Sequence, residues 1–290
     1  PVSMIADALS QLGVTVVTNG GFLPMKLMGK ISGRKAMIDG SSGSQLLTGL
    51  LMALPLLNSD SEITVENLKS KPYISLTCQL LSDFGISIEN HDFRRFVIPG
   101  SQSYRAHEYT VEGDWSGAAF LLTAGAIAGE VTLSNLNCES KQADRAVLDV
   151  LIEAGVPVTV DEKSIRAVRS DLKAFAFDAT DSPDLFPPLA ALASYCSGIS
   201  RIKGVSRLAH KESNRAGAIS EVLGAMNISV RVEDDEMFIE GGGVRGAVIS
   251  SHNDHRIAMM AAVMALDGRG EVTITGAEAV DKSFPDFFDA

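Results

Sequence analysis

The stretch HKESNR, residues 210–215, sets two cations and a carboxylate side by side. Lys211 and Arg215 are four residues apart, so they share one face if the stretch is helical, and Glu212 is close to both. Like charges on one face repel unless an anion lies between them, which points to an anion site. A solvated helix face would contain the same residues, so the choice depends on the elements around them.

Short polar turns also precede apolar helices elsewhere in the chain. They are SGSQ (42–45), SPD (182–184) and NDHR (253–256). Free N–H groups and the positive end of the helix dipole favour anions at such helix starts. Ser, Asp and Asn are also ordinary N-caps, so capping explains each turn taken alone. Gln45 and Arg256 are harder to explain in this way, because neither is a favoured cap.

A repeat of about seventy residues places these turns. Four segments share a short strand, a polar turn and an apolar helix: MIDGSSGSQLLTGLLMALPLL, YTVEGDWSGAAFLLTAGAIAG, FAFDATDSPDLFPPLAALASY and VISSHNDHRIAMMAAVMALDG. Their turns recur at spacings of 72, 68 and 70 residues, at Ser44, Ser116, Asp184 and Asp254. If several units direct these helix starts to one place, they form a shared anion site.

A second series of landmarks holds the same period. Helix ends followed by β-branched strands recur at spacings of 72, 70 and 72 residues, at Gly13, Gly85, Gly155 and Asn227. Gly and Asn tolerate the left-handed conformation that closes a helix. The sequence therefore predicts an α/β protein of βαβαββ units: half a unit, three full units and part of a last one. We expect the first helix of each unit to be buried on all sides and the second to be amphipathic.

Composition limits the class of protein. With 290 residues, 46% of them apolar and 21% charged, the chain reads as globular, with room for two domains. A net charge of −11 argues against nucleic-acid or anionic-membrane binding, so an anionic ligand needs a local cationic site. Three widely spaced cysteines favour buried thiols in a reducing cytosol. His252 and His255 form an HxxH pattern without a nearby carboxylate–cysteine set, so we predict no metal site.

Taken together, the motifs resemble those of the 5-enolpyruvylshikimate-3-phosphate synthase family. The matching stretches are DGSSGSQLLTGLLM, SKPYISLTCQLLSDFGI, YTVEGDWSGAAF, SPDLFPPLAAL, HKESNRAGAI, NDHRIAMM and DKSFPDFF. They run in family order over essentially the whole chain. The resemblance implies an inside-out α/β barrel fold of two similar domains, here a partial first domain at 1–112 and a second at 113–290, closing over substrates in a cleft.

The resemblance also implies an activity. Such transferases add the 5-hydroxyl of shikimate 3-phosphate to C2 of phosphoenolpyruvate and then expel phosphate, in the chorismate branch of aromatic amino acid biosynthesis. They need no metal or organic cofactor. By the same resemblance we expect a cytoplasmic protein that is a monomer at full length, with small-molecule substrates and no nucleic-acid or membrane partner.

Individual roles follow from matching positions. Asp184 would be the base on the 5-hydroxyl, Lys211 would hold the shikimate ligand near it, and Glu212 would carry proton traffic at the methylene carbon. The remaining positions are implied to bind substrate: Ser44, Gln45, Ser70 and Tyr73 for shikimate 3-phosphate, with Gln45 also near phosphoenolpyruvate, Arg207 for an anion in the ligand loop, and Arg215, Arg256 and Lys282 for phosphoenolpyruvate. A carboxylate and a carboxylic acid among cations fit a general base and a general acid.

Several departures from the family pattern bear on this interpretation. Gly43 stands where a serine is usual, and Arg207 stands where an asparagine is often found. The chain begins at Pro1 inside a predicted helix, so we expect the family's N-terminal substrate-binding region to be missing. We therefore expect these 290 residues alone to be inactive or nearly so. The alternatives are a UDP-sugar enolpyruvyl transferase, which would use a loop cysteine, and a non-catalytic repeat scaffold.

Overall fold

The computed structural model describes residues 2–32, 34–41, 43–161, 164–209 and 211–290. The chain divides into two compact units, Pro1–Thr110 (unit 1) and Val111–Ala290 (unit 2). Among the described residues, every helix is too short or too polar to cross a membrane. The three cysteines form no disulfide, and Cys196 is buried.

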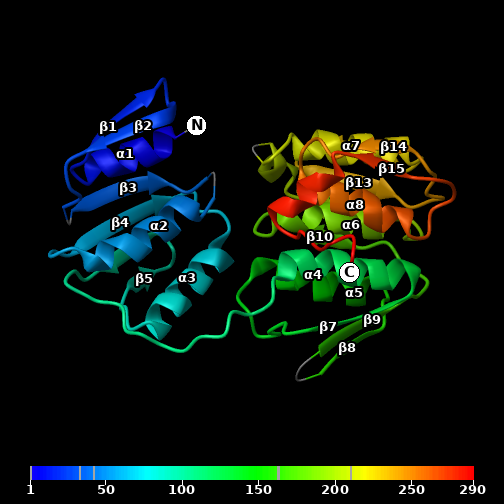
Figure 1. Cartoon of the computed structure of the whole chain (residues 1–290), viewed down its shortest axis with the longest axis horizontal. Coiled ribbons are helices and arrows are strands. Elements are labelled where there is room, and N and C mark those ends of the chain that lie inside the picture. Colours follow the sequence, from blue (N-terminus) through cyan, green and yellow to red (C-terminus); the bar gives the residue numbers. More distant parts are fainter. Residues whose placement is uncertain (1, 33, 42, 162–163, 210) are drawn as a thin grey trace. The chain divides into compact units, whose positions relative to one another are not determined.

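Unit 1 contains one complete repeat preceded by a helix and a hairpin (Figure 1). Its elements are α1 (Ser3–Gln11), β1 (Thr15–Asn19), β2 (Phe22–Met28), β3 (Lys35–Asp39), α2 (Gln45–Ala53), β4 (Ser61–Glu66), α3 (Lys71–Asp83), β5 (Glu89–His91) and β6 (Arg95–Ile98), with a 3₁₀ turn η1 (Leu54–Leu56) after α2. They form a two-stranded sheet, β1-β2, and a four-stranded sheet of order β3-β4-β6-β5.

Unit 2 contains the remaining repeats. The first part comprises α4 (Trp115–Ala128), β7 (Glu130–Ser134), η2 (Ala143–Ala146), α5 (Val147–Glu153), β8 (Val158–Val160) and β9 (Ser164–Val168). The complete repeat comprises β10 (Ala176–Asp178), η3 (Pro183–Leu185), α6 (Phe186–Ala193), β11 (Ile199–Lys203), η4 (Val205–Leu208), α7 (Arg215–Ala225), β12 (Ser229–Glu233) and β13 (Glu236–Glu240). The last part comprises β14 (Val248–Ser250), α8 (His255–Ala265), β15 (Thr273–Thr275) and η5 (Ala277–Lys282).

The βαβαββ unit predicted from the sequence is confirmed by the sheet topology. The complete repeats give the same strand order, β3-β4-β6-β5 in unit 1 and β10-β11-β13-β12 in unit 2. In each, the first two strands are parallel and the last two form an antiparallel hairpin. The helix that follows each parallel strand therefore begins at the same edge of its sheet.

The helix ends follow the second series of landmarks. Gly13, Gly85, Gly155 and Asn227 have φ angles of 94°, 81°, 86° and 67°, all in the left-handed region. The backbone N–H of each bonds to the carbonyl three residues earlier, at Ser10, Ser82, Ile152 and Gly224. The chain thus leaves four helices in the same way, which confirms the prediction made from residue type and spacing.

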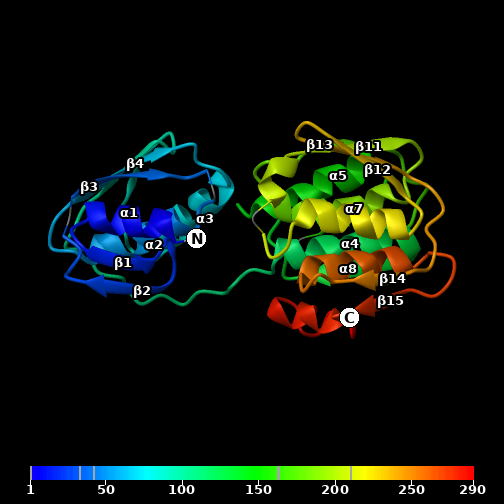
Figure 2. The same cartoon turned by 90° about the horizontal axis from the view of Figure 1, so that it is seen from above.

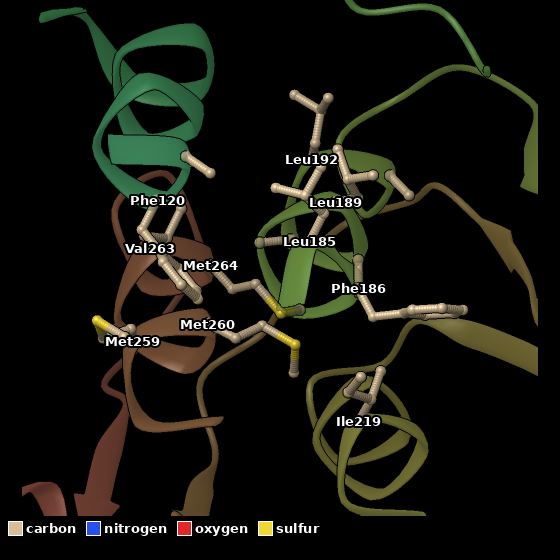
Figure 3. Close-up of a cluster of buried hydrophobic side chains, with 14 of the residues drawn as sticks. Phe120, Leu185, Phe186, Leu189, Leu192, Ile219, Met259, Met260, Val263 and Met264 are labelled. Carbon is tan, nitrogen blue, oxygen red and sulfur yellow. The ribbon is translucent and has the colours of Figure 1, made fainter. Parts of the chain in front are cut away.

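The core of unit 2 is built from the first helices of its repeats. All eight residues of α6 are buried, α4, α6 and α8 contact one another, and α7 contacts α8. Figure 2 shows α4 and α8 running side by side. Figure 3 shows Phe120 of α4, Phe186 of α6, Ile219 of α7 and Met260 of α8 within one apolar cluster. Strands of the surrounding sheets pack against the outer sides of these helices, which holds the helix starts in place.

Two predictions about the repeats are wrong. In α2 only Leu47, Leu50 and Leu51 are buried, and Met52 is exposed, because unit 1 offers α3 but no further first helices to cover it. The strand expected in YTVEG (109–113) is also absent from the described chain. That segment passes from one unit to the other, and Gly113 makes a single backbone bond of 2.7 Å to Asn135, next to β7.

Candidate functional site

Parallel strand pairs bring the predicted residues of unit 2 to common edges. β10 and β11 are parallel, so the turn with Asp184 and the turn with residues 211–215 follow the same sheet edge. β14 and β15 are also parallel, which places residues 254–256 and Lys282 at the edge of their own sheet. Side-chain contacts join the two edges into one cluster.

Arg215 lies at the centre of that cluster. It is the first residue of α7 and its side chain is fully buried. Its Nη1 donates to Asp184 Oδ1 at 2.7 Å, and its Nη2 donates to Glu212 Oε2 at 2.5 Å. The face formed by Nε and Nη2 donates to both oxygens of Asp254, at 2.9 and 3.2 Å. Burial lowers the pKa of Arg215, but the three carboxylates outweigh burial and raise it, so the guanidinium stays charged.

Asp184 is surrounded by three cations, from the turn before α7, from α7 and from α8. Lys211 Nζ lies 3.2 Å from Asp184 Oδ1, and Arg256 Nη2 lies 3.5 Å from Asp184 Oδ2. Burial favours the neutral acid, but the charges of Arg256, Lys211 and Arg215 prevail and hold the pKa of Asp184 well below its ordinary value. Asp184 is therefore a carboxylate at neutral pH, as its predicted role as a base requires.

Glu212 is also held as a carboxylate. Lys282 Nζ donates to Glu212 Oε1 at 3.0 Å, while Arg215 holds the other oxygen. Burial raises the pKa of Glu212, but the bond from Lys282 and the charge of Arg215 lower it to about 2. Sequence reasoning expected one carboxylate and one carboxylic acid here. In this arrangement both groups are ionised, because the cations outnumber the acids that face them.

Asp254 joins the cluster although sequence reasoning did not place it among the site residues. It is fully buried, caps the start of α8, and also accepts a 3.0 Å bond from Ser213 Oγ. The signal was present in NDHR, but an Asp before a helix is explained well enough by capping, and its bonds to Arg215 depend on tertiary contacts.

Arg207 approaches the same region from η4. Its Nε donates to the carbonyl of Thr180 at 3.3 Å, in the loop that leads to Asp184. Burial lowers the pKa of Arg207, and the charges of Asp181 and Asp184 oppose that shift. His210, the first residue of HKESNR, lies outside the described residues.

The remaining predicted residues belong to unit 1. Ser44 is the N-cap residue of α2 and Gln45 is the first residue of that helix. Ser70 precedes α3 in a left-handed conformation, and Tyr73 lies in the first turn of α3. β3 and β4 are parallel, and Thr48 and Thr77 join α2 to α3 at 3.1 Å, so both helix starts lie at one end of unit 1.

Comparison with known proteins agrees with this arrangement of motifs. A family model described as EPSP synthase (3-phosphoshikimate 1-carboxyvinyltransferase) matches residues 1–290. The chain belongs to the EPSP synthase family. The 3-phosphoshikimate 1-carboxyvinyltransferase of Thermococcus kodakarensis is 40% identical over 291 residues, which cover 100% of this chain and 70% of that protein. The 3-phosphoshikimate 1-carboxyvinyltransferase of Clostridium acetobutylicum is 38% identical, over 93% of this chain and 63% of its own length.

Solved structures show the same fold. The EPSP synthase from Acinetobacter baumannii matches with a TM-score of 0.83 and 25% identity, covering 100% of this chain and 69% of that one. The enolpyruvyl transferase NikO from Streptomyces tendae matches with a TM-score of 0.80 at 20% identity, covering 100% and 70%. The chain thus spans about two thirds of the length of these EPSP synthase relatives.

One departure from the family pattern has a local explanation. Gly43 has a φ of 143°, a conformation that side chains rarely adopt. A Cβ at this position would lie 2.8 Å from Gln45 Oε1. The turn before α2 therefore favours glycine and directs the amide of Gln45 back over it, where a serine would displace that side chain.

Proposed function

We propose that this chain is the larger part of a 3-phosphoshikimate 1-carboxyvinyltransferase. The reaction moves the carboxyvinyl group of phosphoenolpyruvate to the 5-hydroxyl of shikimate 3-phosphate and releases inorganic phosphate. One observation carries the proposal: Asp184, Lys211, Glu212, Arg215 and Arg256, predicted from separate motifs, meet in unit 2 in a single network of ion pairs. A non-catalytic repeat scaffold gives no reason for such a network.

The cations suit two anionic substrates. The side chains of Lys211, Arg256 and Lys282 remain 23%, 13% and 55% exposed, whereas Arg215 is fully buried. We infer that the first three contact the substrates directly. The resemblance implied that Arg215 also binds phosphoenolpyruvate, but its full burial favours a different role, in which it fixes the carboxylates between the other cations. Fixed cations offset the repulsion between the phosphate and carboxylate groups of the two substrates, so that these can be held together.

Asp184 is the proposed base. As the 5-hydroxyl oxygen of shikimate 3-phosphate forms its bond to C2 of phosphoenolpyruvate, the Asp184 carboxylate takes the hydroxyl proton and C3 receives a proton. The resulting intermediate then breaks its bond from C2 to the phosphate oxygen, and loss of a proton from C3 restores the vinyl group. Lys211, at 3.2 Å from Asp184, holds that carboxylate where the hydroxyl would arrive.

Glu212 is the proposed carrier of the C3 proton. A pKa of about 2 leaves it unable to donate while Lys282 and Arg215 hold both its oxygens. A substrate phosphate that draws Lys282 away removes the contact that lowers this pKa most, and its negative charge raises the pKa further. In this proposal the phosphoenolpyruvate phosphate therefore prepares Glu212 to take up a proton from water. Glu212 gives that proton to C3 during the addition and takes one back from C3 when the vinyl group forms.

Other parts of the proposal rest on the family alone. Ser44, Gln45, Ser70 and Tyr73 of unit 1 are proposed contacts of shikimate 3-phosphate, and Arg207 of unit 2 is a proposed contact of a substrate anion. The domains are proposed as 1–112 and 113–290, in a cytoplasmic enzyme that is a monomer at full length. We propose that the 290 residues lack part of the substrate site and turn over little or nothing alone.

Calorimetric titration of the 290-residue protein tests the proposal. We expect weak but saturable binding of shikimate 3-phosphate, and of phosphoenolpyruvate added to the same sample. Arg256→Gln should weaken phosphoenolpyruvate binding. Arg169→Gln should not, because Arg169 lies outside the cluster and forms an ion pair of 2.8 Å with Asp267. Failure to bind either ligand would refute the assignment. Binding of a UDP-sugar in place of shikimate 3-phosphate would favour the UDP-sugar enolpyruvyl transferase instead.

A further inference from the structure

Asp254 makes more contacts than helix capping requires. Its Oδ1 accepts the backbone N–H of Arg256 at 3.0 Å and Nη2 of Arg215 at 3.2 Å. Its Oδ2 accepts Nε of Arg215 at 2.9 Å and the hydroxyl of Ser213 at 3.0 Å. One carboxylate thus joins the start of α7, the turn before it and the start of α8.

A second capping aspartate in unit 2 shows what capping alone looks like. Asp114 caps α4 by accepting the backbone N–H groups of Ser116 and Gly117, through Oδ1 and Oδ2. Both of its oxygens serve the helix start. The Asp254 carboxylate accepts one hydrogen bond from the start of α8 and three from Arg215 and Ser213, so most of its hydrogen bonds lie outside α8.

The contact with Arg215 fixes an orientation as well as a charge. Two parallel N–H···O bonds from Nε and Nη2 define the plane of the guanidinium. With that plane fixed, Nη1 is left for Asp184 and the second N–H of Nη2 for Glu212. A buried arginine also needs a counter-charge, and Asp254 is the fully buried carboxylate in the cluster.

We propose that Asp254 is a positioning residue that sets Arg215 and Arg256 relative to each other, and through Arg215 sets Asp184 and Glu212. It touches no substrate in this scheme and acts through the two arginines. The expected effect on ligand binding rests on the proposed function, whereas the placement of Arg215 by Asp254 does not depend on it. Moving the Asp254 carboxylate should therefore disturb the site even where its charge is kept.

The first test needs no substrate. In the wild-type protein, NMR should show a persistent, slowly exchanging Nε–H signal from Arg215. Asp254→Asn should speed its exchange at least tenfold, while Asp114→Asn should leave it unchanged. An unprotected Arg215 signal in the wild type, or full protection in folded Asp254→Asn, would overturn the proposal.

Asp254→Glu separates position from charge, and it keeps a counter-charge for Arg215 if Asp254→Asn fails to fold. We expect a folded protein whose phosphoenolpyruvate affinity is at least tenfold weaker, against a change within about twofold for Asp114→Asn. Wild-type affinity in Asp254→Glu would overturn the positioning role. If the wild type binds no phosphoenolpyruvate, the proposed function fails, and the exchange of the Arg215 signal still decides the role of Asp254.

Discussion

Asp184 and Glu212 both accept bonds from Arg215, and each has a lysine of its own. Lys211 pairs with Asp184 and Lys282 with Glu212. The two carboxylates therefore have different lysine partners, although the charges around them hold both ionised at neutral pH. Substitution at either acid should therefore separate the two proposed proton transfers.

Replacing Asp184 by Asn should remove the base and keep the shape of the site. In the complete enzyme we expect turnover to fall by about 10² to 10⁴, the range typical of a lost general base. Shikimate 3-phosphate binding should persist, because the cations around residue 184 lose a competing anion. Phosphate release and calorimetry measure the two effects. The control is Asp178→Asn, which removes the ion pair between Asp178 of β10 and Lys203 of β11. Equal activity in both variants would contradict the role of Asp184.

Replacing Lys282 by Gln should raise the pKa of Glu212, because the Lys282 bond lowers it most. A carboxylate whose pKa is lowered on folding stabilises the fold at pH values above its ordinary pKa. That stabilisation is lost as the pH falls through the pKa of the folded state. The loss of stability in Lys282→Gln should therefore be full above pH 4.5 and should vanish towards pH 2. Unfolding in urea across this range, with NMR titration of Glu212, measures it. An unchanged Glu212 pKa would refute the pairing.

At the scale of elements, the repeat depends on how each second helix ends. Asn227 follows α7 at a φ of 67°, where a Cβ without a compensating polar group is strained. Asn227→Ala should lower the free energy of unfolding by about 1 kcal/mol. Gly224→Ala, inside the same helix with no atom within 4 Å of its added Cβ, should raise it by about 0.5–1 kcal/mol. Equal effects of the two substitutions in chemical denaturation would contradict this account of the helix end.

Helix ends, burial and tertiary contacts could be predicted from the sequence to different degrees. Gly13, Gly85 and Gly155 mark helix ends by residue type and spacing alone, because the left-handed conformation is a local property. The exposure of Met52 could not be predicted, since it depends on which helices unit 1 brings beside α2. The bonds between Asp254 and Arg215 span 39 positions and close a tertiary contact, so a capping motif gave no sign of them.

At the scale of the molecule, unit 1 has an open strand edge. Among the described residues β2 pairs with β1 alone, whereas its repeat equivalents β6 and β13 each pair on both sides. Phe22 and Leu23 on β2 are more than half exposed. This edge is where a further strand of the repeat would add, so we propose that the N-terminal region of longer family members can attach here.

Joining that region should protect β2. We expect its backbone amides to exchange with deuterium at least tenfold more slowly in the longer protein, because a second row of hydrogen bonds would form. The amides of β13, which already pairs with β11 and β12, serve as the internal control. Unchanged exchange in β2 would show that the added region attaches elsewhere.

The network around Arg215 is proposed to take part in carboxyvinyl transfer once its substrate site is complete. Release of inorganic phosphate, measured with shikimate 3-phosphate and phosphoenolpyruvate alone and together, tests it most directly. With the family's N-terminal region joined to the chain, we predict phosphate release that needs both substrates and is lost in Asp184→Asn. From the 290 residues alone we predict little or no phosphate release. Brisk release by the 290 residues, or none from the folded, completed protein, would contradict it.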